Sequence, residues 1–162
     1  MQPDLAALFS RLGICPVRHE HEAVFTCEAA AALDIAMDGL PTKNLFLKDR
    51  KGRRHFLVVM HDAQRLDLKW LAGALDTDSL SFASAERLDR HLASTPGSVS
   101  LLDILCDRAQ AVELVIDATL WQGEALQCHP YTNTATLVMA LADVRRLLDD
   151  AGRSVRVIEF PA

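Results

Sequence analysis

The chain has 162 residues, of which 50% are apolar and 24% are charged, with 7 Gly, 6 Pro and a formal net charge of −5. This composition predicts a folded protein, excludes a disordered or fibrous one, and opposes nucleic-acid binding by the molecule as a whole. No apolar run approaches the roughly 18 to 20 residues of a membrane span, and the N-terminus lacks the pattern of a signal peptide, so we expect a soluble, cytoplasmic single domain over residues 1–162 that binds no membrane.

The N-terminal part of the chain predicts a helix, an extended segment and a second helix. Leu5, Leu8, Phe9 and Leu12 recur at helical spacing before Gly13, so a helix over 4–12 is expected. Residues 15–21 then read as extended. Thr26 is typical of an N-cap, which predicts a helix that ends before Gly39.

The clearest β-hairpin in the sequence carries a concentrated positive charge. Residues 44–47 and 55–60 are typical of strands and flank a polar segment that contains Gly52. Residues 43–54 hold six basic side chains and only one acidic one, Asp49, so the segment carries +5 and the other residues −10. Either the tip of the hairpin is simply solvated, or it makes a local contact with a polyanion.

The remaining segments alternate between helix and strand without a regular βαβ rhythm, which favours a mixed α+β domain over a doubly wound sheet. We expect helices over 66–75, 83–92 and 143–151, a turn at 95–98, and strands over 80–82, 111–116, 134–139 and 154–160, with a further strand ending near 128.

Covalent and metal chemistry find little support in the sequence. The four cysteines, Cys15, Cys27, Cys106 and Cys128, contain no CxxC pair, so we expect reduced and mostly buried thiols without a disulfide. His19 and His21 share a face if their segment is a strand, but no spacing selects a third metal ligand. Exposed polar residues at a strand end explain them as well, and neither a nucleophile elbow nor a phosphate-binding glycine loop occurs.

Three segments are more polar than their surroundings require. Thr42-Lys43-Asn44 opens an apolar strand, and residues 96–100 offer backbone N–H groups and two hydroxyls in a tight turn. Residues 129–134 place an imidazole, an amide, a phenol and hydroxyls between two strands. Taken singly, each has a structural explanation: a solvated strand end, a helix cap, and a turn held by its own side chains.

In their order and spacing these segments resemble the YbaK/prolyl-tRNA-synthetase-associated family, and most of all its freestanding prolyl-tRNA deacylases of the ProXp-ala type. The similarity covers about residues 26–152. The matching segments are TKNLFLKD with KG from Thr42 to Gly52, DLK at 67–69, LSFAS with ERL at 80–88, PGSVS at 96–100, and HP with NTAT at 129–136.

The resemblance implies a mixed, strongly curved and partly barrel-like β-sheet with flanking helices, and a trans-editing hydrolase that cleaves the ester of mischarged tRNA(Pro), typically Ala-tRNA(Pro). It implies no metal and no cofactor, because water is thought to be positioned with help from the substrate's own ribose hydroxyl. The implied partners are the acceptor end of mischarged tRNA(Pro) and, where the tRNA is delivered, prolyl-tRNA synthetase.

The resemblance also carries residue roles. Lys43 matches the family's critical lysine, which holds the terminal adenosine phosphate or polarises the ester, and His129 matches a histidine at the border of the amino-acid pocket. Asn44 is expected to orient the substrate. The start of a GxxxP loop, which binds the amino-acid end, matches the residues Gly97, Ser98, Val99 and Ser100.

The sequence departs from the family pattern in that loop. Leu101 stands where the loop has proline, and Cys106-Asp107 replaces an Asn-Asp pair. Loss of the proline changes the wall of the pocket, so a slightly larger amino acid such as 2-aminobutyrate is an alternative to alanine. Two other hypotheses are a catalytically silent tRNA- or synthetase-binding module and a small-molecule or metal-binding domain that uses His19 and His21.

Overall fold

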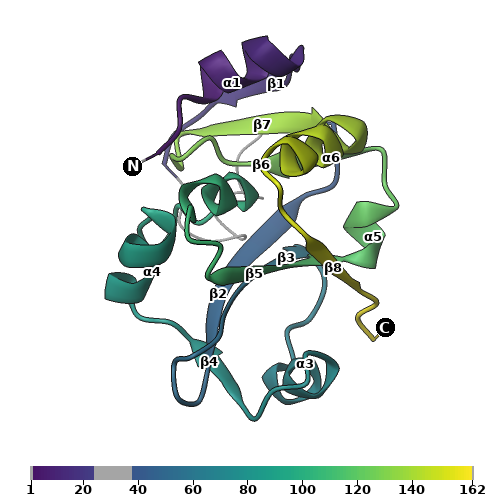
Figure 1. The fold of residues 1–162 in the computed structure, drawn as a ribbon. Coiled ribbons are helices and arrows are strands. Elements are labelled where there is room, and N and C mark those ends of the chain that lie inside the picture. Colours follow the sequence, from purple (N-terminus) through teal and green to yellow (C-terminus); the bar gives the residue numbers. More distant parts are fainter. Residues whose placement is uncertain (1, 24–37, 162) are drawn as a thin grey trace.

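The structure is a computed structural model that describes residues 2–23 and 38–161. Its larger sheet has five strands in the order β4-β2-β3-β5-β8 (Figure 1). β2 pairs antiparallel with β3 and β4, whereas β3, β5 and β8 run parallel to one another, so the sheet is mixed. Its strands are β2 (Thr42–Asp49), β3 (His55–His61), β4 (Leu80–Phe82), β5 (Val112–Asp117) and β8 (Val155–Ile158).

A second, antiparallel sheet lies above the first in Figure 1 and has the order β1-β7-β6. It consists of β1 (Val17–Glu20), β6 (Ala125–Cys128) and β7 (Ala135–Ala140). β7 lies in the middle, so β1 from the N-terminal part of the chain pairs with a strand more than 100 residues later: Val17 is opposite Val138, and on the other side Ala125 is opposite Ala140.

The expectation of one strongly curved, partly barrel-like sheet is wrong. The strands divide into two sheets, and neither is closed or strongly curled. Where the sheets meet, Leu40 makes an isolated parallel bridge with Leu126, just before β2 begins. A single bridge does not continue the ladder of hydrogen bonds from β2 into β6, and the sheets therefore remain separate. The α+β class with flanking helices is confirmed.

The helices begin and end where local chemistry predicts. The Asp4 carboxylate caps the first helix by accepting the Ala7 N–H, and Gly13 ends it with a φ of 69°. Ser84 caps α4 in the same way through the N–H of Arg87. The helices are α1 (Leu5–Leu12), α3 (Leu68–Ala74), α4 (Ala85–Leu92), the 3₁₀ helix η1 (Leu101–Cys106), α5 (Ala118–Trp121) and α6 (Leu141–Asp150).

Most of the expected elements are confirmed, including the hairpin, the strands on either side of His129 and the final helix and strand. The sequence did not predict α5, a single turn after β5, or η1, which forms in the apolar run after Ser100. The helix expected after Thr26 lies outside the described residues. No helix in the described part of the chain has the length and apolarity that a bilayer crossing requires.

Both faces of the larger sheet are buried, and β3 shows this most clearly. Leu57 and Val59 belong to a first core cluster, which is shared with the smaller sheet, α4, η1 and α6. Phe56, Val58 and Met60 belong to a second cluster on the opposite face, which is covered by α3. Because β2 pairs with β3, each side chain of β2 points either to the side of the first core cluster or to the side of the second.

Candidate functional site

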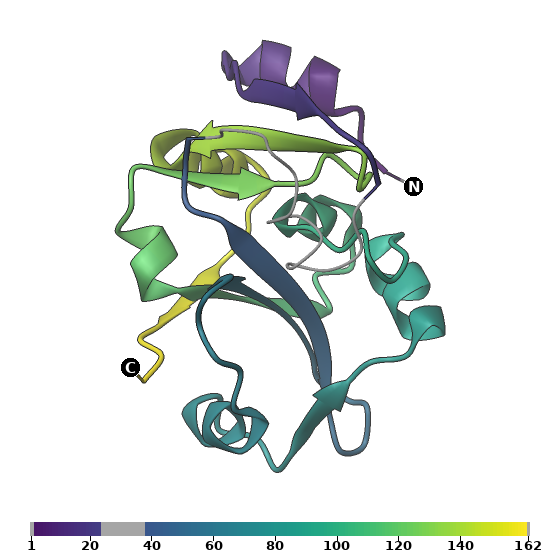
Figure 2. The same cartoon turned by 180° about the vertical axis from the view of Figure 1, so that it is seen from behind.

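The start of β2 is attached to β6 by three hydrogen bonds. Leu40 N–H donates to the Ala125 carbonyl (2.9 Å), and Gln127 N–H donates to the Leu40 carbonyl (3.0 Å). The Thr42 hydroxyl then donates to the Gln127 carbonyl (2.6 Å). The backbone at the start of β2 therefore lies beside β6, whose last residue, Cys128, is followed by His129 (Figure 2).

Lys43 and Asn44 leave opposite faces of the sheet. Lys43 is opposite Met60, a residue of the second core cluster, and Asn44 is opposite Val59, a residue of the first. Directly opposed residues of an antiparallel pair point to the same face. Asn44 therefore faces the side where η1 and the smaller sheet lie, whereas the Lys43 side chain starts from the α3 side at the end of the strand.

Residues 95–98 form a tight turn that leaves two N–H groups free. Ser98 N–H donates to the Thr95 carbonyl (3.0 Å), and Gly97 has a φ of 88° after Pro96, as a type II turn requires. Ser100 N–H donates to Asp103 Oδ2 (2.8 Å). Within the described residues, the N–H groups of Gly97 and Val99 have no protein acceptor and can bind a ligand's oxygen.

The turn is fixed to the core through η1. The Ser100 hydroxyl accepts the Leu102 N–H (3.3 Å), and together with Asp103 it forms a capping box. Leu101, which stands in place of the family's proline, is only 1% exposed and packs in the first core cluster. The packed Leu101 side chain therefore restrains the loop at the position where a proline ring would restrict its backbone.

Three buried polar atoms on the side of the larger sheet that holds the first core cluster have no hydrogen-bond partner in the described part of the chain: Asn44 Oδ1, Asp103 Oδ1 and the Tyr131 hydroxyl. Burial raises the pKa of Asp103, and the Ser100 N–H and the nearby Ser94 oppose that rise. Cys106 lies near Tyr131, but neither the Ser94–Asp103 pair nor the Cys106–Tyr131 pair reaches hydrogen-bonding geometry. Buried polar groups in native proteins are nearly always paired. Such a concentration of unpaired atoms is typical of a site that binds a polar ligand.

His129 begins the connection between β6 and β7. Its Nδ1 lies 3.1 Å from the Ala135 carbonyl, which can only accept, so Nδ1 carries the proton and Nε2 is left as an acceptor. Burial lowers the pKa of His129, and the nearby His21 lowers it further against the opposing effect of the Ala135 bond. The imidazole is therefore neutral at pH 7.

The thiols near the site are poor nucleophiles. Burial, together with the charge of Asp103, raises the pKa of Cys106 to about 11 and that of Cys128 to about 12. Of the three described cysteines Cys128 is buried and Cys106 partly so, but Cys15 is exposed, which corrects the expectation of mostly buried thiols. Cys27 lies outside the described residues.

His19 and His21 have structural contacts. His19 is opposite Thr136 in the smaller sheet, and the Thr136 hydroxyl lies 2.8 Å from His21 Nε2. The other ring nitrogen of His21 lies 2.8 Å from the Glu22 carbonyl. Over residues 2–23 and 38–161, no group of three or more metal-ligating side chains forms.

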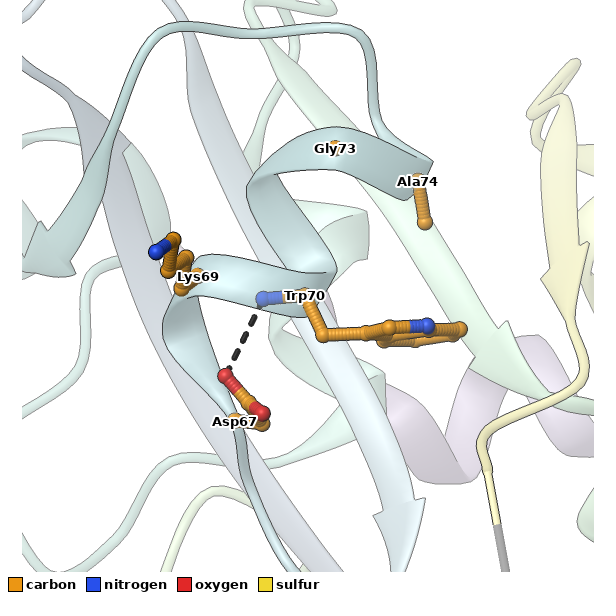
Figure 3. Close-up of a pocket in the computed structure, with 5 residues that line it drawn as sticks. All are labelled: Asp67, Lys69, Trp70, Gly73 and Ala74. Atoms are coloured by element: carbon orange, nitrogen blue, oxygen red, sulfur yellow. Dashed lines mark hydrogen bonds between the residues drawn. The ribbon is translucent and has the colours of Figure 1, made fainter.

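A hollow beside α3 is lined by Asp67, Lys69, Trp70, Gly73 and Ala74 (Figure 3). Asp67 caps α3 by accepting the Trp70 N–H (3.0 Å). α3 covers the second core cluster, and both overall views place it at the end of the larger sheet away from β6 and β7. The hollow is therefore separate from the surroundings of His129 and the 97–100 turn.

The structure thus places Asn44 and the 97–100 turn on the side of the larger sheet where the first core cluster lies. Lys43 starts from the other side of that sheet, and His129 follows the last residue of β6 in the smaller sheet. Sequence reasoning missed Asp103 and Tyr131. An aspartate inside the apolar run Leu101–Leu105 was the available signal for Asp103, because an isolated buried carboxylate is costly and needs a reason. Tyr131 was noted only as the phenol of the polar segment 129–134, and its φ of 65°, which is rare for a non-glycine residue, is visible only in the structure.

Asp103 predicts an unusual pH dependence of stability. Burial raises its pKa to about 7, so the folded state binds this proton more tightly than the unfolded state does. Between about pH 4 and pH 7 stability should therefore fall as pH rises, with a contribution of up to ~1.4 kcal/mol per pH unit. Asp103→Asn should remove that contribution in urea unfolding at pH 5 and pH 8, whereas the exposed Asp149→Asn should keep it. Identical pH dependence in wild type and Asp103→Asn would contradict the assignment.

Comparison with known proteins adds to this geometry. Residues 21–147 match the family model described as an aminoacyl-tRNA editing domain. A relative in Acetoanaerobium sticklandii, "Prolyl-tRNA editing protein ProX", is 39% identical over 141 residues, which are 87% of this chain and 86% of that protein.

A eukaryotic relative and a solved structure agree with this match. "Prolyl-tRNA synthetase associated domain-containing protein 1" of Xenopus laevis is 36% identical over 99% of this chain and 97% of its own length. The crystal structure of hypothetical protein APE2540 superposes with a TM-score of 0.70 at 18% identity, over 94% of this chain and 97% of that one. This structural similarity shows the fold.

Proposed function

Because the chain belongs to the aminoacyl-tRNA editing domain family, we propose that it hydrolyses the ester of mischarged tRNA(Pro), with Ala-tRNA(Pro) as its substrate. The observation that supports the proposal is the tight turn at 95–98 on the side of the larger sheet to which Asn44 points, because the Gly97 and Val99 N–H groups have no acceptor among the described residues. Buried polar atoms of Asn44, Asp103 and Tyr131 also have no hydrogen-bond partner within those residues.

The need for such an enzyme follows from the size of the amino acids. A synthetic site built for proline cannot strongly exclude a smaller apolar amino acid, because a missing methylene changes binding by only about 1 to 3 kcal/mol. A second, smaller site is required to remove the wrong product. A freestanding domain of this size can supply that site in trans.

The reaction needs positioning more than strong nucleophiles, since an aminoacyl ester is already activated. A water oxygen attacks the ester carbonyl carbon, the bond to the ribose oxygen breaks, and the water's proton passes to that ribose oxygen. The N–H groups of Gly97 and Val99 stabilise the negative charge that develops on the carbonyl oxygen. Ser98 and Ser100 hold the turn that presents them.

The side chains divide the remaining tasks. His129, neutral and with Nε2 free to accept, orients the attacking water together with the neighbouring ribose hydroxyl. Asn44 uses its Oδ1, which has no partner among the described residues, to orient the substrate. Lys43 lies at the start of β2, and its side chain leaves the other face of the sheet. From this edge of the sheet its ammonium group binds the phosphate of the terminal adenosine.

Because Leu101 replaces the loop proline, two alternatives to hydrolysis of Ala-tRNA(Pro) stay open. The pocket can admit a slightly larger amino acid such as 2-aminobutyrate, and the domain can bind tRNA or a synthetase without turnover. Intact His129 and Lys43, together with the free N–H groups of the turn, favour an active enzyme over a silent module.

A deacylation panel tests the proposal. We expect the purified protein to hydrolyse tRNA(Pro) charged with alanine, to hydrolyse the 2-aminobutyrate, serine and cysteine esters more slowly, and to leave the proline ester intact. Faster hydrolysis of the 2-aminobutyrate ester would reassign the amino acid within the same reaction. Failure to hydrolyse any of the five esters, with tRNA binding retained, would identify a silent module.

A further inference from the structure

The turn between β2 and β3 presents three basic side chains to solvent. Arg50, Lys51 and Arg53 are exposed, and among the described residues none of them forms an ion pair. They form, with Arg87 of α4, what we call the hairpin surface. On a chain with a net charge of −5, such a concentration of positive charge stands out.

The acidic groups nearby are largely occupied by the turn itself. Asp49, 8% exposed, accepts the N–H groups of Arg53 (2.8 Å) and Arg54 (3.1 Å) through Oδ1. Glu113 makes a two-point pair with Arg54, at 2.9 Å for both contacts. Asp78 accepts the Arg50 N–H (3.3 Å) and remains exposed, so it offsets part of one charge. Most of the positive charge on the turn is therefore available to a partner.

Arg87 is held rigidly against the same turn. Its Nη1 lies 3.0 Å from His55 Nε2 and 3.4 Å from the Gly52 carbonyl. Gly52 has a φ of 68°, which favours glycine, and a Cβ built there would lie 2.7 Å from Arg87 Nη2, so a side chain at this position would displace the guanidinium. The His91 ring packs against His55 with ring centroids 4.3 Å apart and the two rings inclined by 38°.

His55 can serve as the acceptor for Arg87 only while it is neutral. Burial, with the neighbouring His91 and Arg87, lowers the pKa of His55 to about 4. The guanidinium is thus fixed by an uncharged partner and keeps its full charge. A preorganised guanidinium has the geometry that matches a phosphate group.

The hairpin surface lies at the far end of β2 from the candidate site. The eight residues of β2 span about 23 Å from one end to the other. α4 packs on the face to which Asn44 points and leads through Ala93 into the turn at 95–98 (Figure 2). An RNA whose 3′ end enters the site can follow α4 to the hairpin.

We infer that the hairpin surface, Arg50, Lys51, Arg53 and Arg87, binds the phosphate backbone of the acceptor arm of the tRNA substrate. The inference rests on the proposed function for the identity of the RNA. Because the rest of the molecule carries excess negative charge and repels a polyanion, productive binding requires such a local contact. All four residues of the surface are basic, so the contact we propose is to phosphate groups.

The test compares full-length Ala-tRNA(Pro) with an alanyl ester of the CCA trinucleotide, which is too short to reach the hairpin. For the triple variant R50A/K51A/R53A, kcat/KM on the full tRNA should fall roughly 10-fold or more, with a shallower dependence on salt, by about 0.7 to 0.9 in log–log slope per lost phosphate contact. Its activity on the trinucleotide ester should equal that of the wild type.

The matched control, R65A/K69A/R156A, removes three exposed basic residues near α3 and should behave as the wild type on both substrates. Unchanged activity and salt slope in R50A/K51A/R53A, or an equal loss on both substrates with an unchanged thermal unfolding curve, would overturn the inference. If the wild type hydrolyses neither substrate, the proposed function fails. Fluorescence anisotropy with uncharged tRNA(Pro) then tests separately whether the hairpin surface binds RNA. Loss of tRNA binding in the variant supports the inference, whereas equal loss of poly-glutamate binding overturns it.

Discussion

Lys43→Ala is expected to lower kcat/KM for Ala-tRNA(Pro) by ~10²-fold, because a substrate that is no longer held by its terminal phosphate is misplaced at the reacting ester. The fold should be intact, because in the described part of the chain the Lys43 side chain makes no ion pair. The measurement is the rate of release of alanine from labelled Ala-tRNA(Pro), with thermal unfolding followed in parallel.

Lys69→Ala is the matched control for this variant. Lys69 is an exposed lysine at the start of α3 beside the hollow of Figure 3 and has no role in the proposed reaction. Full activity of Lys43→Ala would refute the role of Lys43, and an equal loss of activity in Lys69→Ala would show that the effect is one of general charge.

Asp107→Ala is expected to destabilise the fold by about 3 to 5 kcal/mol, as removal of one partner from a buried ion pair does. Asp107 Oδ2 lies 3.3 Å from Arg153 Nη2, and the two side chains are only 3% and 6% exposed. The same carboxylate accepts the N–H groups of Ala111 (3.1 Å) and Val112 (2.8 Å). The carboxylate therefore joins the end of η1 to the start of β5, and its removal leaves the buried Arg153 guanidinium without its acidic partner.

Urea unfolding measures this effect, and Asp107→Asn is the informative comparison. Asparagine keeps one carbonyl oxygen for the N–H groups but loses the charge, so its destabilisation should lie between that of alanine and zero. A loss below ~1 kcal/mol for Asp107→Ala would contradict the view that this pair holds η1, and with it the 97–100 turn, in place.

Local chemistry made much of the fold predictable. Asp4 and Gly13 bound the first helix, and Gly52 marks the turn of the hairpin, because caps and turns depend on a few neighbouring residues. The division into two sheets was not predictable in this way. The division depends on pairings between distant segments, such as Val17 with Val138. It also depends on the fact that the bridge between Leu40 and Leu126 is isolated and does not extend into a ladder between the two sheets.

The candidate site was predictable as a set of segments and less so as a geometry. The order of the motifs indicated that Asn44, the turn after Pro96 and His129 belong to one functional site. The separation of Lys43 from Asn44 follows from the alternation of a strand, since neighbouring residues point to opposite faces. The buried carboxylate of Asp103 acquires meaning only when the packing of η1 is known, because its burial and its unpaired oxygen are properties of the folded state.

The most direct test of the central claim is a crystal structure with a non-hydrolysable substrate analogue, 3′-alanylamino-3′-deoxyadenosine. The account predicts that the alanyl carbonyl oxygen accepts the N–H groups of Gly97 and Val99, with the alanyl group against His129 and Asn44. An analogue bound in the hollow beside α3, or bound without contact to the turn and to His129, would contradict it.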